Sequence, residues 1–121
     1  MSKAKDDCYA LIQEISVASE TFCQAPECNQ LSDCGHHIYG RDNMATAFLP
    51  EAVIGLCTRC HTGFAHNKPK GFKRFMIERM GEDRYYELKR LSDTTAKHQD
   101  YKAIREGLRE ILRNIKDEPP Y

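Results

Sequence analysis

The sequence predicts a small α+β fold in a single domain: a compact core of two short strands and a following helix, flanked by further helices, with a mostly helical C-terminal half. Three observations lead to this prediction. Cysteines and histidines concentrate between Cys23 and His66, which hold five of the six cysteines and four of the five histidines. Two short runs with strand-forming residues lie inside this stretch. After Pro69, apolar residues recur at helical spacing for most of the remaining chain.

Length and composition are those of an ordinary folded protein. The chain has 121 residues, of which 40% are hydrophobic and 30% charged, which fits one domain with a modest core. The first residues are interrupted by charges too soon for a signal peptide, and no apolar stretch approaches the ~20 residues of a membrane span. We therefore expect a cytoplasmic protein without membrane contact. Clustered cysteines hold metal there more often than they form disulfides, and a disulfide framework is the less favoured alternative.

Within the single domain of residues 1–121, four segments are expected. Residues 1–22 form an N-terminal helix, residues 23–67 the metal-bearing core, residues 68–91 basic helices, and residues 92–121 a C-terminal helix and tail. The charges are unevenly spread, because residues 1–33 carry two basic against six acidic side chains, whereas residues 68–91 carry eight basic against four acidic ones. The basic segment is either a polyanion contact or a solvated helix face.

Local signals place the elements of the first half. Asp6 or Asp7 is expected to cap the first helix. Strands are predicted over residues 36–39 and 52–56, joined through a turn at 40–43, and a short helix over residues 57–65.

The second half is expected to contain three helices. The first carries an apolar stripe that ends at Gly81, the second covers residues 85–91, and the third begins at Asp93 or Thr94. A dimer through the apolar face of this last helix is possible on the pattern alone.

Two cysteine pairs separated by roughly thirty residues have the spacing of a structural zinc site. Four thiolates satisfy the tetrahedral preference of Zn²⁺. Cys34 is a rival for one place, and Cys8, far from the others in sequence, is expected to be a buried thiol. The predicted zinc ligands are Cys23, Cys28, Cys57 and Cys60.

The histidines indicate a second site. His36 and His37 are neighbours on a predicted strand, so their side chains point to opposite faces and cannot do the same job. His61 directly follows a zinc cysteine. One histidine of the pair should face a bound cation while the other faces whatever is attacked.

These residues carry a resemblance. Cys34-Gly-His-His-Ile38 and Leu56-Cys-Thr-Arg-Cys-His61, with the continuation from Phe72 to Tyr85, resemble the zinc-finger-bearing HNH (ββα-metal, treble-clef-like) endonuclease family, and in particular small phage HNH proteins of the recombination-endonuclease (NinG, or Rap) group. The resemblance covers roughly residues 21–91.

The resemblance implies a nuclease that hydrolyses DNA phosphodiesters with a single divalent cation, for which we expect Mg²⁺. Carried over to this chain, it makes His37 the general base, His36 a strand ligand and His61 the helix ligand, with His66 as a further ligand. Residues five apart do not share a face of an α-helix, so His66 requires the helix to break near Gly63. An alternative alignment on the phage subgroup makes His36 the base. The residues expected to contact the DNA backbone are Arg41, Lys68, Lys70, Lys73 and Arg74.

The sequence departs from the family at Ala52, where the resemblance places the asparagine that ties the hairpin together and orients the base. Asn43, in the connecting turn, and Asn67 are the candidate substitutes, and we assign Asn43 to the catalytic set. The departure supports two competing hypotheses: a zinc-stabilised DNA-binding or recombination-accessory module with little or no cleavage, and a structural treble-clef protein that binds protein partners.

Overall fold

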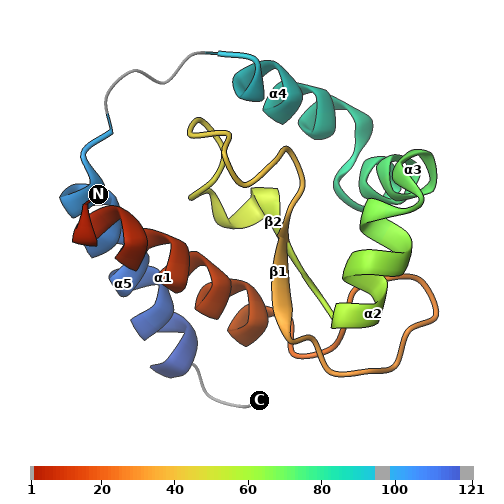
Figure 1. Cartoon of the computed structure of the whole chain (residues 1–121), viewed down its shortest axis with the longest axis horizontal. Coiled ribbons are helices and arrows are strands. Elements are labelled where there is room, and N and C mark those ends of the chain that lie inside the picture. Colours follow the sequence, from red (N-terminus) through yellow and green to blue (C-terminus); the bar gives the residue numbers. More distant parts are fainter. Residues whose placement is uncertain (1, 95–98, 118–121) are drawn as a thin grey trace.

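A computed structural model describes residues 2–94 and 99–117 of the chain. Its fold is α+β, with one antiparallel two-stranded sheet among helices (Figure 1). In chain order the elements are α1 (Lys3–Ser19), β1 (Cys34–His37), the 3₁₀ turn η1 (Pro50–Ala52), β2 (Val53–Leu56), α2 (Thr58–Cys60), the π-helix η2 (His61–His66), α3 (Pro69–Met80), α4 (Glu82–Ser92) and α5 (Tyr101–Asp117). Among the described residues, no helix has both the length and the apolar character needed to cross a membrane.

The hairpin lies at the centre of the molecule, with α1 and α5 on one side and α2 and α3 on the other (Figure 1). Its register pairs His36 with Ile54 and His37 with Val53. Because side chains alternate across a strand, Val53 joins the apolar cluster of α1 and α5, whereas Ile54 joins the cluster that contains Cys23, Cys57 and residues of α3. All four residues of β2 are buried, since both faces of the hairpin are covered.

The N-terminal helix is confirmed, but its cap is not the expected one. Ser2 precedes the first turn, and its hydroxyl accepts a hydrogen bond from the Lys5 N–H at 3.3 Å. The expectation of Asp6 or Asp7 as the cap is wrong because the helix begins earlier, at Lys3. Cys8 is 0% exposed, as expected of a buried thiol.

The first strand is displaced by two residues from its predicted position, and the second is one residue shorter at its start. The first ends at His37 instead of Tyr39, and the second begins at Val53 because Ala52 closes the preceding 3₁₀ turn.

The helices after Pro69 confirm most of the predicted pattern. Gly81 ends α3 with a φ of +92°, a backbone conformation that residues other than glycine rarely adopt. The last helix begins at Tyr101, not at Asp93 or Thr94, and the Asp100 carboxylate accepts from the Ala103 N–H at 3.1 Å. The tail expected after residue 117 lies outside the described residues.

The apolar face of α5 packs against α1 of the same chain, where Leu108 and Leu112 are buried with Ile12 and Ile15. This internal contact uses the face that the sequence offered for a dimer, an option the sequence pattern left open.

Candidate metal-binding sites

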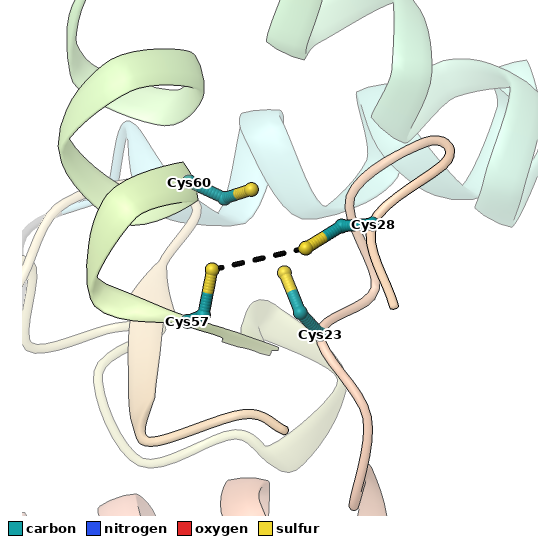
Figure 2. Close-up of side chains that lie close together, drawn as sticks. All are labelled: Cys23, Cys28, Cys57 and Cys60. Carbon is teal, nitrogen blue, oxygen red and sulfur yellow. Dashed lines mark hydrogen bonds between the residues drawn. The ribbon is translucent and has the colours of Figure 1, made fainter. Parts of the chain in front are cut away.

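Four cysteine sulfurs converge between the turn of residues 23–28 and the start of the helix after β2 (Figure 2). The sulfurs of Cys23, Cys28, Cys57 and Cys60 all lie within 4.8 Å of one another. The Sγ atoms of Cys28 and Cys57 are 3.8 Å apart. Two thiolates bound tetrahedrally at the usual Zn–S length of about 2.3 Å would lie about 3.8 Å apart. The cluster therefore has the dimensions of a four-thiolate metal site, and the predicted grouping is confirmed.

The local backbone explains how a pair with four intervening residues joins this site. The Cys23 N–H donates to the Gln30 carbonyl at 2.8 Å, and the Cys28 N–H donates to the Ala25 carbonyl at 3.2 Å. Glu27 takes a positive φ of 61° to complete the turn. These bonds bring the two cysteines of the pair to the same side of the loop.

Cys34 is not part of the four-cysteine site. Its thiol donates to the Leu56 carbonyl at 3.3 Å across the hairpin, and burial raises its pKa to about 11. Its sulfur is not among the four that lie within 4.8 Å of one another. The alternative of Cys34 as a zinc ligand is therefore not supported.

The protonation of the cluster depends on backbone donors and on burial. A hydrogen bond from the backbone of Gln30 lowers the pKa of the Cys28 thiol to about 7. Burial raises the pKa of Cys23 and of Cys60. Burial therefore opposes ionisation of the Cys23 and Cys60 thiols, and a cation bound among the sulfurs would offset that cost.

Three histidines form a second cluster beside the first. The ring nitrogens of His36, His61 and His66 lie within 4.8 Å of one another. The Nε2 atoms of His61 and His66 are 3.1 Å apart, and the His36 ring lies 5.0 and 5.1 Å from theirs, centroid to centroid. The three residues come from β1 and from the two ends of η2. Three imidazoles at these distances can hold one cation and leave positions open for other ligands.

The π-helix explains why His66 belongs to this cluster. In η2 the Asn67 N–H bonds to the Thr62 carbonyl five residues earlier, at 3.2 Å. This wider winding brings residues five apart onto neighbouring positions of one face, which an α-helix does not do. The expectation that the helix would break near Gly63 is wrong. The helix widens instead, and short π-helical segments of this kind occur frequently at functional sites.

The environment of His36 keeps its imidazole neutral. Burial, with smaller effects from the neighbouring histidines, lowers the pKa of His36 to about 4. Burial also lowers the pKa of His61. Neutral imidazole is the form that binds metals, so both rings are ready as ligands at neutral pH.

His37 lies on the other face of β1, as the alternation of strand side chains requires. It is 8% exposed, and its Nε2 lies 3.0 Å from the Ala47 carbonyl. A carbonyl only accepts hydrogen bonds, so Nε2 carries the proton and the Nδ1 lone pair is left free. Burial lowers the pKa of His37, which keeps the ring neutral.

One open cavity of about 540 Å³ borders both strand histidines. His61 and His66 also line it, as do Gln13 from α1 and Arg41 from the turn after β1. The Arg41 guanidinium lies over the Tyr9 ring at 4.0 Å, which holds this cation at the edge of the cavity.

The Asn43 side chain bonds to α4 and Ala52 is packed in the core, so neither contributes a side chain to the histidine cavity. The Asn43 amide donates to the Ser92 carbonyl at 2.6 Å, and Asn43 does not line the histidine cavity. Its link to His37 is indirect. The backbone carbonyl of Asn43 accepts from the N–H of Ala47 at 2.8 Å, and Ala47 in turn contacts His37 through its own carbonyl. Ala52 is 1% exposed, and its carbonyl accepts from the Ile38 N–H at 2.9 Å. The structure therefore makes Asn43 a loop residue and Ala52 a packed one.

The basic residues of the segment 68–91 differ in their ion pairing. Arg84 and Lys89 of α4 form ion pairs with Glu51, Glu87 and Asp93. The first four basic residues are exposed, and the ion pairs found among residues 2–94 and 99–117 include none of them. We call this set the basic quartet: Lys68, Lys70, Lys73 and Arg74.

Sequence reasoning missed two contributors to the site. Gln13 reaches the cavity from α1, and the Asp33 carboxylate accepts from the Thr58 hydroxyl at 2.8 Å where α2 begins. The Thr58 hydroxyl and backbone lower the pKa of Asp33. Neither residue belongs to a spaced motif, so no sequence signal identified them.

Comparison of the chain with protein-family models, with curated proteins and with solved structures found no match.

Proposed function

We propose that this protein is a metal-dependent DNA endonuclease of the HNH type, with a structural zinc ion on the four cysteines and a second cation on the three histidines. The observation that carries the proposal is the arrangement of β1. One histidine of the strand joins two helix histidines as a ligand set, while the next residue is a neutral histidine that borders the same cavity. A three-histidine site beside a separate neutral histidine suits metal-assisted hydrolysis with a general base.

His37 acts as the general base in this proposal. The Ala47 carbonyl holds the proton on Nε2, so that Nδ1 accepts a proton from the attacking water. The cation on the histidines supplies polarisation of the phosphoryl oxygen and stabilisation of the leaving oxygen. Arg41, at the cavity edge, and the exposed basic quartet contact the phosphate backbone of the DNA.

The donor set changes the expected metal. Mg²⁺ prefers oxygen ligands and retains its waters, whereas imidazole nitrogens suit Zn²⁺, Ni²⁺ and other transition metals. Three imidazoles with no carboxylate among them therefore favour a transition metal over the expected Mg²⁺.

The test measures cleavage of linear, nicked and branched DNA with Mg²⁺, Mn²⁺, Ni²⁺ and Zn²⁺ supplied in turn. His37→Ala should lower the rate by roughly 10²–10⁴-fold while the protein retains both metals. His66→Ala should lose the second metal together with activity. Thr62→Ala, which removes an exposed side chain from the same π-helix, is the matched control and should behave as wild type.

Three results would change the assignment. If His36→Ala is inactive but binds the second metal normally, the two strand histidines have exchanged roles. Wild-type rates in both strand variants would end the nuclease proposal.

The third result concerns DNA binding without cleavage. The basic quartet is exposed and has no ion-pair partner among the described residues, which favours a zinc-stabilised DNA-binding module as the second candidate function. Salt-sensitive DNA binding with no cleavage under any of the four metals would select that function.

A further inference from the structure

The side chain of Gln13 pairs with both backbone polar groups of Gly35 in β1. Its Nε2 donates to the Gly35 carbonyl at 2.8 Å, and its Oε1 accepts from the Gly35 N–H at 2.7 Å. The amide thus occupies the free edge of β1 as one residue of a third strand would. Gln13 lies on α1, outside the segment that resembles the nuclease family.

These two bonds bear directly on the orientation of His36. The Gly35 carbonyl belongs to the peptide unit that links Gly35 to His36. The Gly35 N–H belongs to the preceding unit, which links Cys34 to Gly35. Each peptide unit is planar, so a hydrogen bond to one atom of each unit restricts the rotation of both planes.

The residue between these two planes must be glycine. A Cβ on Gly35 would lie 2.8 Å from Val53 Cγ1 and 3.0 Å from Ser16 Cβ. The absence of a side chain lets α1 approach closely enough for Gln13 to reach the strand. The same absence leaves the backbone freer than at any other residue, so the bonds from Gln13 restrict a position that would otherwise be loose.

We propose that Gln13 is a positioning residue for the metal ligand His36. The effect on cleavage rests on the proposed function, whereas the effect on metal binding at the three histidines does not.

The test compares Gln13→Met with wild type, both carrying one zinc per chain on the cysteines. Methionine keeps the length and apolar contacts of the side chain and removes both hydrogen bonds. Titration with Ni²⁺ should show binding to the histidine site weakened by about 10-fold or more, the range for residues that support metal ligands. Hydrogen exchange at the Gly35 N–H should accelerate, and zinc content should stay the same. At saturating Ni²⁺, kcat should fall while KM for DNA is unchanged.

Gln24→Met is the matched control. The Gln24 amide also donates to a backbone carbonyl, that of Phe22 at 2.7 Å, but it does not line the histidine cavity. This variant should bind Ni²⁺ as wild type does. Gln13→Asn keeps the amide on a side chain one methylene shorter, and serves as a second variant with the same expected loss if the methionine variant does not fold.

The outcomes separate this proposal from the nuclease proposal. Ni²⁺ affinity within twofold of wild type in the Gln13 variants overturns the positioning role, whatever the wild type does to DNA. Tight Ni²⁺ binding by a wild-type protein that never cleaves overturns the nuclease proposal and leaves the comparison of variants valid. A wild type that binds no second ion overturns both.

Discussion

Replacing Gly35 with alanine tests whether α1 and the hairpin are as closely packed as the structure shows. The new Cβ would lie 2.8 Å from Val53 Cγ1, 3.0 Å from Ser16 Cβ and 3.1 Å from Ser16 Oγ. Val53 and Ser16 are both buried, so neither side chain can move aside without displacing its own neighbours. Overpacking of this kind costs about 1–3 kcal/mol. For a domain of this size, 1 kcal/mol corresponds to a shift in Tm of about 4 °C.

We therefore expect Gly35→Ala to lower Tm by about 4–12 °C. The assay is thermal denaturation followed by far-ultraviolet circular dichroism at one fixed zinc concentration, because bound metal shifts Tm by mass action. Gly107→Ala is the matched control. A Cβ there meets nothing within 4 Å, and alanine in a helix is more stable than glycine by about 1 kcal/mol. A Gly35→Ala protein with a Tm at or above that of wild type would refute the close packing of α1 on the strand.

Three further predictions concern the metal, the DNA interface and acid stability. The purified chain should contain one tightly held zinc ion, and Cys57→Ser or a strong chelator should remove it and unfold the core; metal analysis that finds no zinc contradicts the four-thiolate site. Alanine at all four positions of the basic quartet should reduce the log–log salt slope of DNA binding by up to about 0.9 for each phosphate that the variant no longer neutralises. Alanine at the ion-paired Arg84 and Lys89 should leave that slope unchanged, and equal slopes in both variants would assign the quartet to solvation. The Asp7 carboxylate pairs at 3.0 Å with an arginine of α5, which holds the pKa of Asp7 below its usual value. Its stabilisation is therefore present above pH about 4 and disappears as pH falls through the lowered pKa, so the Tm deficit of Asp7→Asn at neutral pH should shrink on acidification; a deficit constant with pH would contradict the ion pair.

The sequence alone predicted the elements and residues whose signals are local. Paired cysteines identified the four-sulfur cluster, because the number and spacing of thiolates follow from the tetrahedral preference of the metal. Alternation along a strand required His36 and His37 to face opposite ways, and the hairpin confirms it. Helical periodicity and Gly81 placed α3 with its end, since both depend on the conformations of neighbouring residues.

Tertiary structure decided which distant groups meet. His66 joins His36 because the helix after the clustered cysteines winds as a π-helix, and this helix contacts both β1 and α3. Asn43 had the right chemistry to support the strand histidine, but its amide bonds to Ser92 instead. Gln13 bonds to the strand across 22 positions of sequence, and no local pattern encodes an interaction at that separation. Motif spacing reports the chemistry that a short segment can perform, whereas the orientation of each ligand depends on contacts that form only when the whole chain is packed.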